Sequence, residues 1–180
     1  MTTLAVSARS PRTRALGIVL AAGALALGSQ FALPVPGTPV PITLQPMLVV
    51  LAGLLLGPVD GAAAMVLYLV AGAAGLPVFA PMGAPGLLRL LGPTGGYLLA
   101  YPVAAVVAGR FGAGRSSYAT RAIAAAAGIL VLYAGGMAQL AVITGSVSRA
   151  AILGVVPFVA IDAVKALVAA ALAGFRRRTV

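Results

Sequence analysis

Cysteine, histidine and tryptophan are all absent from this chain of 180 residues. Without cysteine and histidine, the chain has no disulfides, no thiolate chemistry, no usual zinc site and no acid–base catalysis by histidine. Acidic residues are almost as scarce, because Asp60 and Asp162 are the only two. The sequence shows no nucleophile–base pair and no cluster of metal-binding residues. The sequence therefore predicts neither an enzyme nor a bound cofactor or metal.

Charge of either sign is also rare. Only 8% of the residues are charged and 62% are hydrophobic, with a mean hydropathy of +1.13, whereas a soluble domain carries about 25% charged residues. The long apolar runs favour membrane-spanning helices over a barrel, because a helix satisfies its own backbone groups in lipid. We predict an all-α, polytopic membrane protein with six transmembrane helices.

The predicted helices alternate with short irregular stretches, which are proline-rich at 31–46, glycine-rich at 75–96 and a polar turn at 144–156. The helices cover residues 14–30, 47–56, 61–74, 98–110, 122–143 and 157–175. We expect residues 14–175 to form one transmembrane domain, flanked by cytoplasmic tails at 1–13 and 176–180. The first apolar run also fits a signal peptide, but it is long enough to span a membrane and lacks a clear cleavage site.

The net charge of +10 is best explained by membrane topology. In a soluble protein such a charge would suggest nucleic acid as a partner, but here the arginines lie near helix ends and in short loops, so we predict no such partner. With the N-terminus inside, nine arginines lie on the cytoplasmic side: Arg9, Arg12, Arg14, Arg110, Arg115, Arg121, Arg176, Arg177 and Arg178. Only Arg89 and Arg149 lie outside. This asymmetry predicts a multi-pass cell-membrane protein with both termini in the cytoplasm.

Two irregular stretches lie on the predicted outer side. Residues 31–46 contain five prolines, Pro34, Pro36, Pro39, Pro41 and Pro46, and no charge, so no helix continues through them. This stretch is either a simple connector or a lid over the membrane-embedded domain. Residues 75–96 are rich in glycine, and we expect them to fold partly into the domain with exposed backbone amides.

The last predicted helix holds Asp162 and Lys165, the only lysine. Each ionised group near a bilayer centre costs about 2.5–3.5 kcal/mol on insertion scales, and the i, i+3 spacing puts both on one helix face. The pair either neutralises itself and locks helix packing, or marks a functional site. As a site, Asp162 accepts N–H groups, while Lys165 and Arg89 attract a carboxylate. An ion or drug carrier fits these features nearly as well.

Several segments also resemble a known family. They are Pro-Val-Pro-Ile-Thr-Leu-Gln at 39–45, Leu-Ala-Gly-Leu-Leu-Leu-Gly-Pro at 51–58, Gly-Leu-Pro-Val-Phe at 75–79, Gly-Pro-Thr-Gly-Gly-Tyr at 92–97, and Pro-Phe-x-x-x-Asp-x-x-Lys from 157. In order and over nearly the whole chain, they resemble the BioY family, the biotin-binding S components of energy-coupling factor (ECF) vitamin transporters. The resemblance implies six helices, an outward-facing biotin site, and a partner complex of a membrane coupling subunit and two ATP-binding subunits.

The resemblance also suggests which residues bind the substrate. Asp162 and Lys165 match the family motif directly, whereas Arg89 lies in a variable stretch that contains Pro81 and Pro85 here. The other predicted binding residues are Thr43, Gln45, Phe79, Gly92, Pro93, Thr94, Gly95, Gly96 and Tyr97, and Tyr68 is a further candidate beside an apolar ligand body. A carrier or channel that works without partners remains the main alternative function.

Small residues recur in the first predicted helix, including Ala22 and Ala26 four positions apart. Such spacing lets helices approach closely in lipid. S components dock their coupling subunit through small residues of this helix, so the resemblance implies that Ala22 and Ala26 form the docking surface. Alanine is abundant throughout the chain, so the same spacing also arises by chance.

Overall fold

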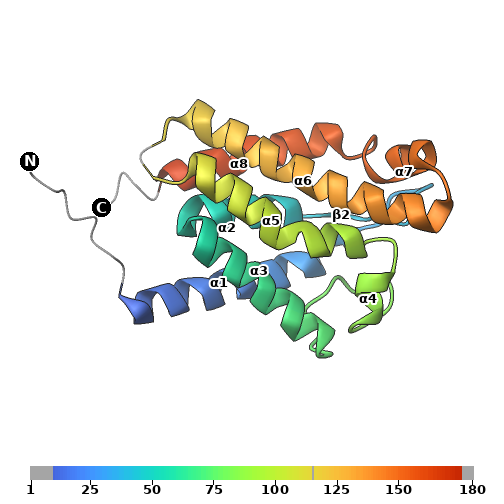
Figure 1. The fold of residues 1–180 in the computed structure, drawn as a ribbon, viewed down its shortest axis with the longest axis horizontal. Helices are drawn as coiled ribbons and strands as arrows, with labels where there is room; N and C mark the ends of the chain where they lie inside the picture. Colours follow the sequence, from blue (N-terminus) through green and yellow to red (C-terminus); the bar gives the residue numbers. More distant parts are fainter. Residues whose placement is uncertain (1–9, 115, 176–180) are drawn as a thin grey trace, which may run out of the picture.

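Six long helices form the body of the protein in a computed structural model, which describes residues 10–114 and 116–175 (Figure 1). They are α1 (Pro11–Gln30), α2 (Gln45–Leu56), α3 (Pro58–Ala73), α5 (Gly95–Gly112), α6 (Tyr118–Thr144) and α8 (Val159–Phe175). Each overlaps one predicted helix, and the all-α, six-helix prediction is confirmed. Of the predicted tails, only residues 10–13 lie within the described residues. Five of the arginines lie outside them: Arg9, Arg115, Arg176, Arg177 and Arg178.

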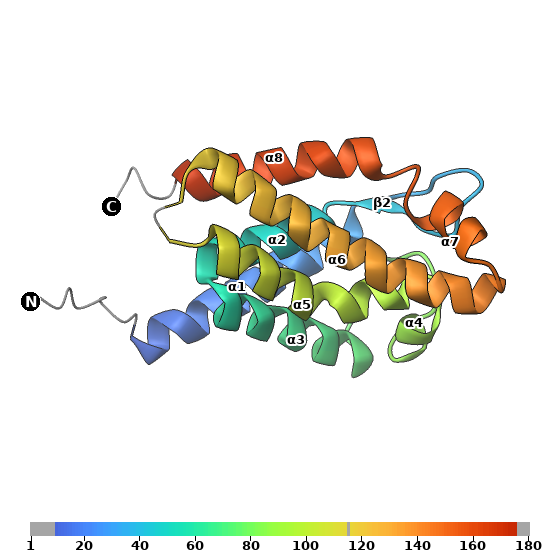
Figure 2. The same cartoon turned by 45° about the horizontal axis from the view of Figure 1, so that its top comes forward.

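The bundle has two different ends (Figures 1 and 2). At one, here called the loop end, lie the short helices α4 (Leu88–Leu91) and α7 (Val147–Gly154) and the hairpin of β1 (Ala32–Leu33) and β2 (Ile42–Thr43). At the other, here called the terminal end, α1 begins, α2 turns into α3, α5 leads into α6, and α8 ends. The chain therefore crosses from one end to the other six times.

Local signals set these boundaries. Gly57 adopts a positive φ of 90° between α2 and α3, and Pro58 opens α3, where its missing N–H costs no helical hydrogen bond. Asp60 lies in the first turn of α3, as predicted from its preference for a helix N-terminus. Its carboxylate also accepts hydrogen bonds from the Arg14 guanidinium, the shortest at 2.7 Å, so α1 and α3 are joined at the terminal end.

Two segments differ from the sequence prediction. The polar stretch 144–156 was expected to be a turn, but it contains α7, whose N-cap Ser146 accepts a hydrogen bond from the backbone N–H of Arg149 at 3.3 Å. The prediction for the proline-rich stretch excluded a helix and named no strand, and the structure adds the β1–β2 hairpin there, with Ala32 opposite Thr43. Both missed elements are short and lie at the loop end.

The outer surface of the bundle is apolar. Leu27, Phe31, Leu91 and Val142 are each exposed over 68% or more of their surface, as expected for a protein whose outer faces contact lipid tails. By length and composition alone, two described helices are able to cross a membrane, α1 and α6, and the bent pair α7 and α8 would make a third. The protein is a multi-pass membrane protein, in which the shorter apolar helices α2 and α3, together with α5, complete the bundle.

Helix α1 is an integral part of this bundle. It buries Ala22, Leu25, Gly28 and Ser29, and Ala26 packs at the edge of the same core. The burial of Ala22, which is only 8% exposed, means that the predicted docking pair faces mainly inward. The outer side of α1 is formed instead by other residues, among them Leu16, Leu20, Gly23, Ala24 and Leu27.

Candidate functional site

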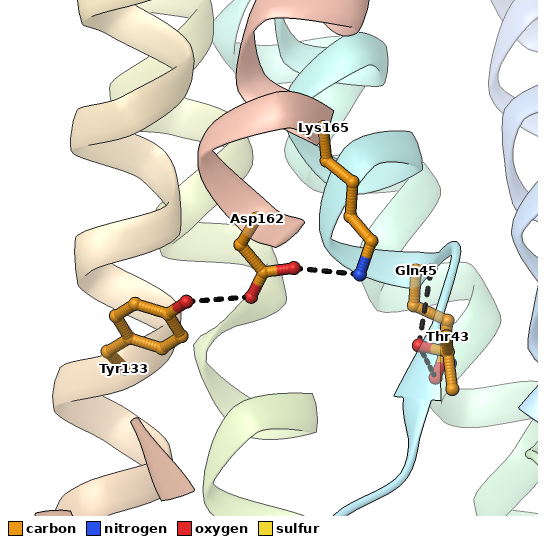
Figure 3. A network of polar contacts seen from close by, with 5 residues as sticks. All are labelled: Thr43, Gln45, Tyr133, Asp162 and Lys165. Carbon is orange, nitrogen blue, oxygen red and sulfur yellow. Dashed lines mark hydrogen bonds and ion pairs between the residues drawn. The ribbon is translucent and has the colours of Figure 1, made fainter. Parts of the chain in front are cut away.

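A buried ion pair lies on α8. The Lys165 Nζ atom is 2.7 Å from Asp162 Oδ1, and the two residues are only 7% and 4% exposed (Figure 3). Removing charges from water is expensive, so such a pair is weak evidence for a purely stabilising role. Both side chains also line a cavity at the loop end, where a bound molecule has access to them.

Tyr133 is a third member of this group. It reaches across from α6, and its hydroxyl donates a 2.8 Å hydrogen bond to Asp162 Oδ2 (Figure 3). The two carboxylate oxygens therefore receive donors from two different helices. The sequence prediction located Tyr133 within its helix but not at the site, because 29 positions separate it from Asp162 and no spacing rule connects them.

The cavity is partly open, and the space between its walls, including solvent at its mouth, is about 690 Å³. Its lining residues are Val40, Pro41, Ile42, Thr43, Gln45, Pro46, Phe79, Ala80, Arg89, Thr94, Tyr97, Leu98, Tyr101, Leu132, Tyr133, Gly154, Phe158, Asp162 and Lys165. They come from the hairpin region, the glycine-rich loop and four of the long helices. The proline-rich segment thus forms one wall of the cavity, which a simple connector would not do.

Arg89 enters the cavity from α4. Its guanidinium donates hydrogen bonds to the carbonyl oxygens of Ala80 and Met82, which fastens the preceding loop. Its Nε atom is buried and has no hydrogen-bond partner among the described residues. Burial lowers the pKa of Arg89, but a guanidinium stays charged in proteins. An unpaired N–H of a cationic group is a natural position for a ligand carboxylate.

Thr43 and Gln45 form the polar side of the hairpin wall. The Thr43 hydroxyl donates to Gln45 Oε1 at 3.2 Å, and Gln45 Nε2 donates to the Tyr68 hydroxyl at 2.8 Å. Tyr68 itself is not a lining residue, but its ring packs edge-on against Phe79 at a centroid distance of 5.4 Å. Thr43, Gln45 and Phe79 therefore line the cavity, and Tyr68 packs against Phe79 and binds Gln45 without lining it.

The segment Gly-Pro-Thr-Gly-Gly-Tyr divides into two groups. Thr94 and Tyr97 line the cavity, and the Tyr97 hydroxyl donates a 2.6 Å hydrogen bond to the carbonyl oxygen of Gly154. The other four predicted residues do not line it: Gly92, Pro93, Gly95 and Gly96. The Gly92 carbonyl instead accepts a hydrogen bond from Gln139 at 2.6 Å, so this part of the segment joins α5 to α6.

The arrangement favours one class of ligand. Asp162, Lys165 and Arg89 are the only charged lining residues, and their charges sum to +1. The other walls are mostly apolar or aromatic, with ring systems at Phe79, Tyr97, Tyr101 and Phe158 among them. A small monoanion with an apolar body and N–H donors for Asp162 would neutralise the site. No group of three metal-binding acids, histidines or cysteines occurs in the described part of the chain.

Comparisons with known proteins agree with this geometry. Residues 2–180 match the BioY family. A probable biotin transporter BioY from Pyrococcus horikoshii is 44% identical over 75% of this chain and 79% of its own length. A biotin transporter BioY from Thermotoga maritima is 38% identical over 77% of this chain and 82% of its own length.

A solved structure shares the fold. The S-component for biotin from an ECF-type ABC transporter superposes with a TM-score of 0.83 and covers 95% of both chains. The sequences are 23% identical, so this likeness concerns the arrangement of the helices.

Proposed function

The chain belongs to the BioY family, and from this premise we propose that it is the biotin-binding membrane subunit of an ECF transporter, capturing biotin for uptake driven by partner ATPases. The observation that carries the proposal is the buried Asp162–Lys165 pair facing a cavity with one further cation, Arg89. Biotin has ureido N–H groups, an apolar bicycle and chain, and a carboxylate, which together complement these three charges and the apolar walls.

In this proposal the polar groups of biotin have separate partners. Asp162 accepts the ureido N–H groups, and the carboxylate lies near the cations Lys165 and Arg89. Phe79 and Tyr97 flank the apolar body, and Thr43, Gln45 and Thr94 complete the polar wall. Gly92, Pro93, Gly95 and Gly96 shape the backbone beside the ligand and approach it less closely than the lining residues do.

The loop end faces the outside of the cell in this proposal. Arg12, Arg14, Arg110 and Arg121 belong to segments at the terminal end, whereas Arg89 and Arg149 belong to α4 and α7 at the loop end. The positive-inside rule favours the terminal end as the cytoplasmic side. Residues 1–13 and 176–180 are then cytoplasmic tails of a transmembrane domain that spans residues 14–175.

The proposed partners are a membrane coupling subunit and two ATP-binding subunits. In this proposal the ATP-binding subunits supply the energy for uptake. Purification from cells that express a complete transporter tests this proposal. Recovery of the ATP-binding subunits with the tagged chain supports it, and uptake by this chain alone in proteoliposomes would favour a stand-alone carrier.

A binding titration tests the site itself. We expect Asp162→Asn to weaken biotin binding about tenfold or more, because a hydrogen bond to a charged group contributes about 1.5–3 kcal/mol. Asp60→Asn is the matched control, since it makes the same chemical change in the other acidic residue, at the opposite end of α3 from the cavity. Equal affinities for both folded variants would contradict the assignment of Asp162.

A further inference from the structure

We infer that Tyr133 is a positioning residue for the ligand: its hydroxyl fixes the plane of the Asp162 carboxylate so that both oxygens are aligned to accept paired N–H donors. The inference deepens the proposed function and rests on it for the identity of the ligand. It starts from the one polar contact that joins α6 to the charged pair, the 2.8 Å hydrogen bond from the Tyr133 hydroxyl to Asp162 Oδ2.

The two donors to Asp162 are arranged on opposite sides. Lys165 Nζ binds Oδ1 from one turn along the same helix, and the Tyr133 hydroxyl binds Oδ2 from a neighbouring helix. Figure 3 shows the carboxylate held between them. Each oxygen has more than one acceptor site, so each keeps capacity for a ligand N–H after its protein donor is bound.

Rotamer preferences do not supply this alignment. The last torsion of an aspartate is broad, so the carboxylate plane is set by its hydrogen bonds and not by the side chain itself. Lys165 alone, on a long flexible stem, would leave Oδ2 free to rotate away from the ligand. A second anchor from α6 removes that freedom, and sites that bind tightly depend on such supporting contacts.

Two other roles for Tyr133 have to be distinguished from positioning. The hydroxyl could serve only to hold α6 against α8, or it could contact the ligand directly, since Tyr133 lines the cavity. Tyr118 provides a matched control for the first role. It lies on the same helix, and its hydroxyl also reaches α8, where it donates to the carbonyl oxygen of Leu167 at 3.4 Å.

A double-mutant cycle with biotin separates these roles. We expect Tyr133→Phe to weaken biotin binding about tenfold in the otherwise unchanged protein, and Tyr118→Phe to change it less than about twofold. In an Asp162→Ala background, which has no side-chain oxygen to accept the Tyr133 hydrogen bond, the effect of Tyr133→Phe should fall below about twofold, because a residue that acts through Asp162 has nothing left to position. An effect of the same size in both backgrounds would show direct ligand contact and overturn the inference.

A second measurement needs no ligand. Asp60 and Asp162 are the only side-chain carboxylates in the chain, so in Asp60→Asn protein, aspartate labelled at its side-chain carboxyl carbon gives an infrared signal from Asp162 alone. Tyr133→Phe should shift this carboxylate band and Tyr118→Phe should not. An unchanged band overturns the inference. If the unmodified protein fails to bind biotin while the band shifts, the proposed function is wrong but the positioning contact stands.

Discussion

Gly96 illustrates how a single residue sets the distance between two helices. A Cβ atom added to Gly96 of α5 would lie 2.2 Å from the backbone carbonyl oxygen of Gly135 in α6. Because the obstacle is backbone and not a flexible side chain, α5 and α6 would have to separate. A Cβ at Gly95 would lie 1.9 Å from the backbone carbonyl oxygen of Leu90, whereas one at Gly92 would make only ordinary contacts. Gly95 and Gly96 are therefore required for close packing, and they influence the cavity through the position of Tyr97.

We predict that Gly96→Ala destabilises the protein by about 1–3 kcal/mol, the usual cost of overpacking a tight interior. Gly23→Ala is the control. A Cβ at Gly23, within α1, meets no atom within 4 Å, and alanine favours a helix over glycine by about 0.5–1 kcal/mol. Thermal unfolding in detergent should give a lower midpoint for Gly96→Ala only. A similar loss in both variants would contradict the close-packing explanation.

The residues of the site were predictable to different degrees. Asp162 and Lys165 stand out in the sequence because charge inside an apolar helix is costly. Tyr133 gives no such signal, since aromatic residues are ordinary in a membrane helix. Only the packing of α6 against α8 brings the Tyr133 hydroxyl to the carboxylate.

At the scale of elements, the six long helices were predictable and the short elements of the loop end were not. Hydropathy identifies an apolar helix regardless of its neighbours. The strands β1 and β2 have two residues each and depend on pairing with each other. Strands this short are not predictable from alternation of polar and apolar residues in the sequence. Helix α7 depends on an N-cap, Ser146, in a stretch whose composition suggested a turn.

The outer side of α1 leads to a prediction about assembly. Gly23 and Ala24 are exposed between the larger residues Leu20 and Leu27, and small residues on a lipid-facing side let another helix approach. We predict that Gly23→Leu with Ala24→Leu prevents co-purification with the coupling subunit but changes biotin affinity by no more than about 0.5 kcal/mol, because the site is distant.

The control for this experiment is Ala126→Leu with Ala134→Leu, which enlarges two exposed positions of α6 instead. It should leave assembly intact. By contrast, Ala22→Leu with Ala26→Leu should lower the stability of the isolated chain, because Ala22 belongs to the core. If the Gly23 and Ala24 variant assembles normally, the docking surface lies on another helix.

At the scale of the whole molecule, the two ends of the bundle have different compositions. The loop end holds the cavity and the short elements, and the terminal end holds Arg12, Arg14, Arg110 and Arg121 in its helix termini. During membrane insertion, the end that carries more arginines is retained on the cytoplasmic side. A ligand site at the loop end is accessible from outside only if the chain inserts with that end outward, so orientation and function depend on the same arginines.

The absence of cysteine makes this orientation directly testable. Ser148→Cys and Ala119→Cys each place one thiol at an exposed position, the second residue of α7 at the loop end and the second residue of α6 at the terminal end. A membrane-impermeant maleimide applied to intact cells should label only Ser148→Cys, because the proposed topology puts Ala119 in the cytoplasm. After permeabilisation both should react equally. Labelling of Ala119→Cys in intact cells would mean that the chain inserts the other way round, and the cavity would then open toward the cytoplasm.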